Sequence, residues 1–264
     1  MDKPLIRLSQ SQLNLLETCP PQFQRLYLED LGTPPSPDTQ DSLSWGSQFH
    51  QLMQQEQLGL PIQSFLGEDQ ELQKALNALV NVVKIEHHLT EESWKEAEHS
   101  RSLEFDNYLL TAIYDLLILE DNRAQILDWK TYLKPQNKEK LAKNWQTRLY
   151  LYLLAETSDY LPEQISMTYW FVKLPNEPQS LTFTYDSKTH QKTAQDLSYL
   201  LGQLESWLSD YLDNKQSFNH ISNCQSICPY YETFFDNNLD LDDENKENDW
   251  LFDLDEIEEI AVNL

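Results

Sequence analysis

Hydrophobic residues in the first third of the chain recur three and four positions apart, which is the period of an amphipathic helix. A first predicted helix breaks midway at the proline pair that begins with Pro20, because proline removes a backbone donor and restricts the residue before it. Residues 32–42 hold one glycine and three prolines without periodicity, so they predict a loop. Two further helices are predicted around residues 45–53 and 72–83. The chain is therefore expected to open with a helical segment.

The middle of the chain changes to the pattern of strands, with β-branched and aromatic residues between short turns. Residues 94–105 and 108–119 flank Asp106-Asn107, a two-residue connection typical of a β-hairpin. Further along, the pattern predicts a strand over residues 123–130, an amphipathic helix over 141–153, strands over 165–172 and 181–185, and a long helix over 189–212. This order predicts an α/β fold in which a mixed central sheet is flanked by helices.

Composition favours a folded protein and narrows its class. Of the 264 residues, 40% are hydrophobic and 11% are aromatic, which is typical of a globular chain. The longest apolar stretch, residues 109–119, is interrupted by Asp115 and is too short to span a bilayer, so we expect no membrane partner. Three cysteines without an export signal fit a reducing, cytoplasmic location. The five glycines form neither a P-loop nor a dinucleotide fingerprint, which argues against ATPase and hydride chemistry.

The net charge of −25 is unevenly distributed, which matters because a nucleic-acid partner favours basic surfaces. Residues 236–264 hold twelve acids and one lysine. We therefore expect one folded domain over residues 1–235 and an acidic tail over 236–264 that is flexible or loosely docked. Between residues 123 and 148 the balance reverses: Arg123, Lys130, Lys134, Lys138, Lys140, Lys143 and Arg148 face only Asp128 and Glu139. Competition between the tail and DNA for this basic island is a further hypothesis.

Charged residues interrupt two of the predicted strands. Side chains alternate along a strand, so Asp128 and Lys130 share one face while their apolar neighbours share the other. Asp115 interrupts the adjacent hairpin strand. Two converging carboxylates form the oxygen ligand set that Mg²⁺ or Mn²⁺ prefers, and an ammonium beside them can orient an attacking water and stabilise charge on a phosphate. Because an Asp-x-Lys triplet alone is more often a structural ion pair, the hypothesis depends on its combination with Asp115.

Several short motifs follow one another along the chain, and they are informative as a set. They are Leu8-Ser9-Gln10-Ser11 through Cys19-Pro20, Trp45-Gly46-Ser47-Gln48-Phe49-His50, Glu98, Tyr114-Asp115, Asp128-Trp129-Lys130-Thr131 and Gln146-x-x-x-Tyr150. With these residues the chain resembles the RecB-like branch of the PD-(D/E)XK nuclease superfamily over most of residues 8–235. One position departs from the family's pattern, since Ala112 stands where the family usually has glycine.

The resemblance implies a restriction-endonuclease-like core that carries a metal-dependent nuclease site. The catalytic residues that it implies are Asp115, Asp128 and Lys130. The implied ligands of Mg²⁺ or Mn²⁺ are His50, Asp115, Asp128 and the backbone carbonyl of Trp129, and Glu98 matches a glutamate that the family often has before the hairpin. We expect Gln146, Tyr150, Arg148 and Lys134 to contact the substrate strand. Without the resemblance, His50 would be interpreted as an ordinary histidine of a core or its rim.

The three cysteines raise the question of a bound cluster. Iron–sulfur members of the family pair an early cysteine with a late Cys-x-x-Cys-x₅-Cys, whereas this chain has Cys19 and Cys224-x₃-Cys228. Phe234 stands where the last cysteine would be, and a cluster needs four good ligands, for which His220 is a substitute in principle. The spacing therefore favours reduced cysteines that pack the C-terminal segment against the first helix, rather than an iron–sulfur or zinc site.

The sequence thus predicts a metal-dependent DNA nuclease that acts in DNA repair, recombination or defence, and it favours exonuclease action over cutting at a specific sequence. Because no ATPase motif is present, we also consider a partnership with a separate helicase or repair subunit. The rival hypothesis is a nuclease fold with little turnover that serves as a DNA- or protein-binding regulatory module. The net charge of −25 favours the rival, and the complete set of Asp115, Asp128 and Lys130 favours the enzyme.

Overall fold

The computed structural model describes residues 6–32, 37–62, 69–87, 93–131, 137–173 and 178–221, together with Cys224 and Cys228. The chain divides into two compact units, one built from residues 1–10 and 41–194 and the other from residues 11–40 and 195–264. The predicted boundary at residue 235 and the acidic tail lie outside the described residues, so both remain predictions.

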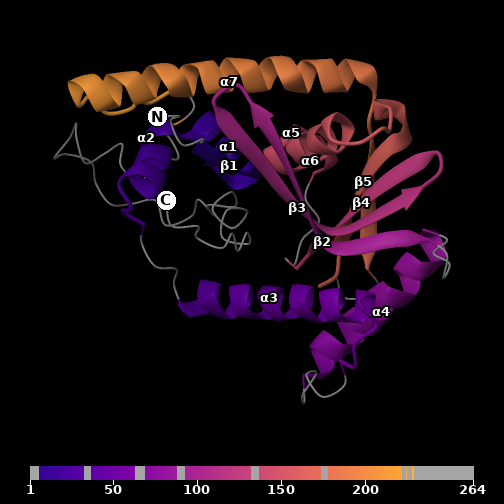
Figure 1. Cartoon of the computed structure of the whole chain (residues 1–264). Helices are drawn as coiled ribbons and strands as arrows, with labels where there is room; N and C mark the ends of the chain where they lie inside the picture. The colour runs from indigo at the N-terminus through magenta and orange to yellow at the C-terminus, as the bar shows by residue number, and fades with distance from the viewer. Residues whose placement is uncertain are drawn as a thin grey trace. The chain divides into compact units, whose positions relative to one another are not determined.

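The first unit is built on a mixed six-stranded β-sheet (Figure 1). Its strands are β1 Ile6–Leu8, β2 Trp94–Phe105, β3 Tyr108–Glu120, β4 Arg123–Lys130, β5 Ile165–Phe171 and β6 Gln179–Thr184. They lie in the order β1-β3-β4-β5-β6, and β2 pairs with β3 as well. β1 runs parallel to β3 and β4 parallel to β5, while the other pairs are antiparallel. The predicted α/β fold with a mixed central sheet is confirmed.

One face of this sheet packs against α3 Pro37–Gln57 and α4 Gln70–Glu86. Phe49 and Met53 of α3 and Leu76 of α4 belong to the same buried cluster as Trp129 and Trp170 from the strands. The apolar stripe of each helix, at three- and four-residue spacing, is what brings these side chains onto the sheet. Because successive side chains on a strand alternate, the neighbours of the two tryptophans are directed away from this layer.

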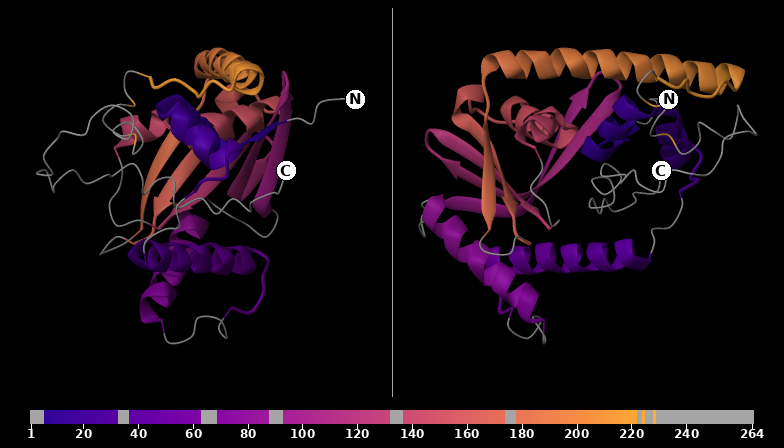
Figure 2. Two further views of the ribbon diagram at one scale, coloured as in Figure 1. Left: turned by 90° about the vertical axis from the view of Figure 1, so that its left-hand side faces the viewer. Right: turned by 180° about the vertical axis from the view of Figure 1, so that it is seen from behind.

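The opposite face of the sheet carries α6 Trp145–Glu156, which follows the short helix α5 Lys138–Lys143. Thr147 of α6 and Tyr169 of β5 share a buried hydrogen bond of 2.8 Å between their hydroxyls. The hydroxyl of Tyr114 on β3 donates to the carbonyl oxygen of Tyr150 at 3.0 Å. These buried polar contacts attach α6 to two strands. Figure 2 shows the sheet and its helices from two further directions.

The second unit contains α1 Gln10–Thr18, α2 Pro20–Phe23, a π-helical turn Gln24–Leu28 and most of the long helix α7 Ser187–Asn214. The helix break predicted at the proline pair is confirmed, since Cys19 separates α1 from α2. After α7, the ring of Phe218 packs against Phe23 and Trp207, with centroid distances of 6.4 and 5.6 Å. The N–H of Phe218 donates to Oε1 of Gln24 at 2.6 Å. The segment after α7 is therefore attached to the region of α2.

One strand was missed and two local predictions were wrong. β1 was not predicted, because a strand of three residues is too short to show a period. α3 begins at Pro37, inside the predicted loop 32–42, since proline is tolerated in the first turn of a helix. The single helix predicted over residues 141–153 is divided at Asn144, whose side chain accepts the N–H of Gln146 at 2.7 Å and caps α6.

The predicted strands over residues 94–105 and 123–130 coincide with β2 and β4. The predicted helix over residues 72–83 lies within α4. Within the described part of the chain, none of the helices is long and apolar enough to cross a lipid bilayer.

Candidate active site

Asp115 lies where two strands of the sheet part. The β3–β4 ladder runs from the pair Glu120 and Arg123 to the pair Leu116 and Leu127, and Asp115 is the next residue of β3. Its Oδ2 accepts the backbone N–H of Trp129 at 2.6 Å. A side-chain oxygen thus satisfies a donor of β4 just beyond the last of these pairs, which holds the carboxylate at the point of divergence.

His50 reaches Asp115 from α3. Nδ1 of His50 lies 3.0 Å from Oδ1 of Asp115. Burial alone would lower the pKa of His50, but the charge and hydrogen bond of Asp115, together with the charge of Asp128, raise that pKa to about 9. The histidine therefore binds a proton tightly beside two carboxylates, and a cation at this position would have to displace that proton.

A glycine allows the helix to come this close. A Cβ atom built on Gly46 would lie 3.0 Å from Oγ1 of Thr131, the residue that follows β4. Gly46 is one helical turn before His50, so both residues lie on the same side of α3. The absence of a side chain at Gly46 therefore lets α3 pass close to the end of β4 and brings the imidazole to Asp115.

Glu98 completes a group of three ligand side chains. It lies on β2 between Ala97 and His99, which pair with the two neighbours of Asp115. One ligand atom each from His50, Glu98 and Asp115 lies within 4.8 Å of the other two. Two carboxylates and one imidazole form a donor set that suits a divalent cation. The structure thus contains a side-chain group that could hold a metal ion.

The backbone and the acidity of Glu98 are both unusual. Its φ of 52° lies in the left-handed region, which residues other than glycine seldom adopt in a strand. Burial raises the pKa of Glu98 to about 7, and the negative charges of Asp115 and Asp128 contribute to that rise, while His50 opposes it. A cation nearby would stabilise the ionised form of this carboxyl group.

Asp128 and Lys130 form a buried ion pair next to this group. Nζ of Lys130 lies 3.0 Å from Oδ1 of Asp128 and donates to Oε1 of Gln146 at 2.8 Å. Nε2 of Gln146 donates to the other oxygen of Asp128, also at 2.8 Å. Burial raises the pKa of Asp128 to about 6; Lys130 opposes this shift and Asp115 adds to it. The predicted sharing of one strand face by Asp128 and Lys130 is confirmed by their common partner on α6.

The predicted site residues therefore fall into two adjoining sets. His50 and Asp115 lie with Glu98 in the three-residue ligand group, whereas both oxygens of Asp128 are directed to Lys130 and Gln146. Trp129 contributes its N–H to Asp115. Metal ligation by Asp128 and by the carbonyl of Trp129 remains a proposal.

Sequence reasoning noted Glu98 as a family position but did not count it as a ligand. The signal was present in the hairpin. A two-residue turn at Asp106-Asn107 pairs Phe105 with Tyr108, and counting back along both strands places Glu98 opposite Asp115. Residues that face each other across an antiparallel pair lie within side-chain reach.

The predicted substrate-contacting residues occupy different positions on α6. Gln146 contacts the buried ion pair, as described above. The ring of Tyr150 is buried 5.1 Å from the ring of Tyr114, and burial raises its pKa well above the usual range. The guanidinium of Arg148 lies 4.0 Å from the ring centre of Trp145. Lys134 lies outside the described residues.

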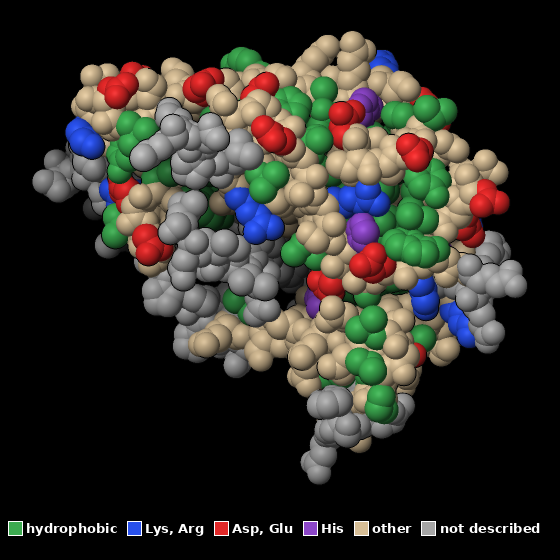
Figure 3. Space-filling view, in the orientation of Figure 1, with side chains coloured by type: hydrophobic (Ala, Val, Ile, Leu, Met, Phe, Trp, Pro, Cys, Tyr) green, Lys and Arg blue, Asp and Glu red, His purple; other side chains and the backbone are tan. Residues whose placement is uncertain are grey.

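Among the described residues of the basic island, several side chains have partners of their own. Arg123 pairs with Glu120, and Nζ of Lys138 lies 5.5 Å from the ring centre of Phe183. Lys130 is largely buried in the ion pair with Asp128. On the face seen in Figure 3, the Lys and Arg side chains that are coloured lie in small separate groups among acidic ones. Contact with a nucleic acid would therefore rely on local groups of basic residues.

The cysteines named by the sequence come together in the second unit. Sγ of Cys224 lies 2.8 Å from Sγ of Cys19, and Nδ1 of His220 lies 3.2 Å from Sγ of Cys224. Cys228 is buried in the same group, and all three cysteines are free thiols. Phe234 lies outside the described residues.

Comparison with known proteins gives one family match. The family described as the PD-(D/E)XK nuclease superfamily matches residues 7–233. No curated protein is similar enough to this chain to count as a relative. A solved structure of a candidate exonuclease from Eubacterium rectale is 11% identical, with 89% of this chain and 90% of that chain covered at a TM-score of 0.51. This likeness supports the fold alone.

A second solved structure, that of a protein named SSO0001, is 12% identical over 87% of this chain and 88% of its own. Its TM-score of 0.38 is too low to support an argument.

Proposed function

The chain belongs to the PD-(D/E)XK nuclease superfamily, and on this premise we propose that it hydrolyses DNA phosphodiester bonds with Mg²⁺ or Mn²⁺. The action that we propose is that of an exonuclease of the RecB-like branch, in DNA repair, recombination or defence. One observation carries the proposal: two groups of side chains lie next to each other on the sheet. They are the ligand group around Asp115 and the buried ion pair of Asp128 and Lys130.

His50, Glu98 and Asp115 would hold the metal ion, joined by Asp128 and the backbone carbonyl of Trp129, and this oxygen-rich donor set fits a hard divalent cation. When bound, such an ion polarises a phosphodiester oxygen and lowers the pKa of a water molecule. The chain's own contribution is to hold these donors in place: Asp115 is fixed by the N–H of Trp129, and His50 is delivered by α3.

Lys130 would orient the attacking water and stabilise the negative charge that develops on the phosphate. Its ammonium is held between Asp128 and Gln146, and it lies 5.2 Å from the ring centre of Tyr169. A side chain restrained on three sides loses little further freedom when substrate binds, so its charge is preorganised. Gln146 acts as a positioning residue, because its amide binds both members of the ion pair.

The substrate strand would pass over the side of the sheet that carries α6. We propose that Arg148 and Lys134 contact its phosphates and that Gln146 and Tyr150 support the position of the strand near the reacting bond. Phosphate contacts of this kind fix register without reading sequence, which suits an enzyme that acts at ends. A separate helicase or repair subunit would supply strand opening. We also propose a cytoplasmic location.

The test is metal-dependent cleavage of linear DNA by the wild type, Asp128→Ala and Lys130→Ala. We expect Mg²⁺- or Mn²⁺-dependent turnover in the wild type and a loss of about 10²–10³-fold in each variant. Asp128→Ala removes a carboxylate that would bind the metal ion, and Lys130→Ala removes the ammonium that would stabilise the charge on the phosphate. The matched controls are Asp106→Asn in the hairpin turn and Lys188→Ala at the exposed start of α7. Equal rates in the wild type and both site variants would refute the assignment.

A second candidate function is a DNA- or protein-binding regulatory module with little turnover, which the net charge of −25 and the divided basic surface favour. The same panel separates it from the enzyme. Equal DNA binding by the wild type and both site variants, with no cleavage by any of them in either metal, would support the regulatory module.

A further inference from the structure

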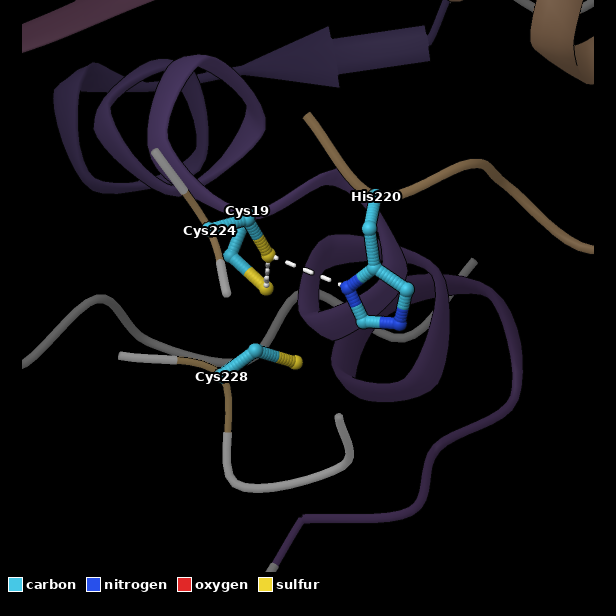
Figure 4. Close-up of side chains that lie close together, drawn as sticks. All are labelled: Cys19, His220, Cys224 and Cys228. Atoms are coloured by element: carbon cyan, nitrogen blue, oxygen red, sulfur yellow. Dashed lines mark hydrogen bonds between the residues drawn. The ribbon is translucent and has the colours of Figure 1, made fainter. Parts of the chain in front are cut away.

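Three cysteines and one histidine from distant parts of the sequence meet in the second unit. Cys19 lies between α1 and α2, while His220, Cys224 and Cys228 follow α7. Figure 4 shows the three sulfur atoms and the imidazole directed toward a common centre. The ligand atoms of all four residues lie within 4.8 Å of one another. This group shares no residue with the candidate active site.

We propose that Cys19, His220, Cys224 and Cys228 bind one Zn²⁺ as a closed, structural site. Three thiolates and one imidazole nitrogen are an established zinc donor set, and four protein ligands leave no open position for catalysis. This assignment is independent of the proposed nuclease function, because it rests on other residues and other chemistry.

The spacing of the donors favours a single ion over a cluster. Around a tetrahedral Zn²⁺ with Zn–S distances of about 2.3 Å, ligand sulfurs stand roughly 3.8 Å apart. The ligand atoms of the observed group lie within 4.8 Å of one another, which is close to this spacing. Rotation of the Cys19 and Cys224 side chains would lengthen their Sγ–Sγ distance from 2.8 Å to the required value. An iron–sulfur cluster holds its cysteines around a body of iron and sulfide atoms and needs a wider arrangement.

Simple packing of reduced cysteines explains the burial of the sulfurs but not the imidazole. Cys19 and Cys224 are completely buried and Cys228 is 7% exposed, as cysteines in a core often are. A core of thiols does not require a polar ring, yet Nδ1 of His220 points at Sγ of Cys224 from 3.2 Å. A nitrogen donor aimed at a set of sulfurs is the arrangement that a metal ion would stabilise.

The backbone around the group supports the placement of each ligand. The N–H of Cys228 donates to the carbonyl of Cys224 at 2.8 Å, which sets these two ligands one turn apart. Two residues before His220, Phe218 is attached to Gln24 through its N–H and to Phe23 through its ring. The scaffold thus brings the imidazole to Cys224 without help from a metal ion.

A bound ion would tie Cys19 to His220, Cys224 and Cys228 and so link the two chain segments that make up the second unit. An ion that binds the folded chain and not the unfolded one shifts the folding equilibrium toward the folded state. We therefore expect zinc to raise the thermal unfolding midpoint of the full chain.

The test is the metal content of the full chain, purified under reducing conditions with Zn²⁺ and measured by mass spectrometry of the elements. We expect about one zinc per chain in the wild type and less than roughly a tenth of that in Cys228→Ser and in His220→Ala. Two controls should keep their zinc: His190→Gln, a histidine outside the group, and Asp115→Asn, which disables the ligand group of the first unit.

Three results would overturn the proposal. They are free thiol reactivity of all three cysteines in a wild type that retains no zinc, iron with inorganic sulfide in protein purified without oxygen, and a disulfide between Cys19 and Cys224. Because the Cys228→Ser chain could fail to fold, a second measurement uses the wild type alone. Replacement of zinc by Co²⁺ should give the absorption of tetrahedral cobalt with thiolate charge transfer, and an octahedral spectrum would equally contradict the site.

Discussion

The two units each hold a group of potential metal ligands, and the groups differ in donor chemistry and in access. In the first unit two carboxylates and one imidazole gather, and the His50 side chain is 32% exposed. In the second unit the donors are three buried sulfurs and one imidazole. Oxygen-rich groups with an accessible side suit hard ions that exchange water and substrate, whereas closed sulfur-rich groups suit zinc that holds a fold together.

The difference also appears in what surrounds each group. Next to Asp115 lies the ion pair of Asp128 and Lys130, which is charged, buried and bound to Gln146. Two residues before His220, the ring of Phe218 packs against the rings of Phe23 and Trp207. Burying a pair of charges costs desolvation free energy, and buried charges with shifted pKa values are concentrated at functional sites. The first region therefore resembles an active site, whereas the second resembles a hydrophobic core.

The sharpest way to separate the two regions is Asp115→Asn. We expect it to lower metal-dependent DNA cleavage by about 10³-fold, because it removes the negative charge that would bind the metal ion and that pairs with His50. Zinc content and the thermal unfolding midpoint measured with and without chelator should change as in the wild type. A parallel loss of zinc would show that the two regions are not independent.

Removal of zinc by a chelator tests the second region and should leave the ligand side chains of the first unchanged. A zinc chelator should lower the thermal unfolding midpoint by about 5–10 °C, because a ligand that binds the folded state stabilises it by mass action. Differential scanning calorimetry of the full chain measures the change. His220→Ala should start from the lower midpoint and show no further response, whereas His190→Gln should respond as the wild type does.

Gln146→Leu tests the support of the ion pair. The variant leaves Lys130 and one oxygen of Asp128 without their shared partner. We expect kcat to fall about 10–100-fold and KM to change much less, since the ion pair loses its support while the phosphate contacts proposed for Arg148 and Lys134 remain. A change confined to KM would mean that Gln146 binds substrate and does not position the pair.

The affinity of the first unit for Mg²⁺ should rise with pH. The pKa of His50 is about 9 and that of Glu98 about 7, so at pH 6 both ligands carry protons that a metal ion must displace. As pH rises through 7 and toward 9 these protons are lost, and we expect affinity to increase by roughly tenfold or more across this range. Titration calorimetry at several pH values gives the slope, which Glu98→Gln should reduce.

The smallest expected effect concerns the close approach of α3. Gly46→Ala should lower the free energy of unfolding by about 1 kcal/mol, because the new methyl group crowds Thr131. Gly202→Ala in α7 is the matched control, since nothing lies within 4 Å of its Cβ position. There we expect a gain of about 0.5–1 kcal/mol from helix propensity. Equal changes in the free energy of unfolding of the two variants, measured by urea denaturation, would show that Gly46 is not needed for the close packing of α3.

Sequence predicted those parts of the molecule that depend on local patterns. The alternation in β4 placed Asp128 and Lys130 on one face, and the two-residue turn set the hairpin of β2 and β3. Asn144 shows where pattern reasoning failed, because one hydrogen bond to its side chain ended an apolar period that continued beyond it. A cap of this kind depends on one polar side chain, and a pattern of hydrophobic positions contains no information about it.

Features that depend on distant residues could be predicted only in part. Glu98 joins the group of potential ligands because it lies opposite Asp115, a register that counting back from the hairpin turn gives, and because it has an unusual φ, which the sequence does not reveal. His220 was considered only as a substitute ligand, since nothing local to it indicates that Cys19 lies nearby. Contacts across about 200 residues are set by packing of the whole unit rather than by any local preference.

The central claim is that Asp115 binds a divalent cation together with His50 and Glu98, and diffraction from crystals soaked in Mn²⁺ tests it most directly. The account predicts an anomalous scattering peak bonded to Asp115, with oxygen and nitrogen ligands from Glu98 and His50. Mn²⁺ bound elsewhere while His50 keeps its hydrogen bond to Asp115 would contradict the claim.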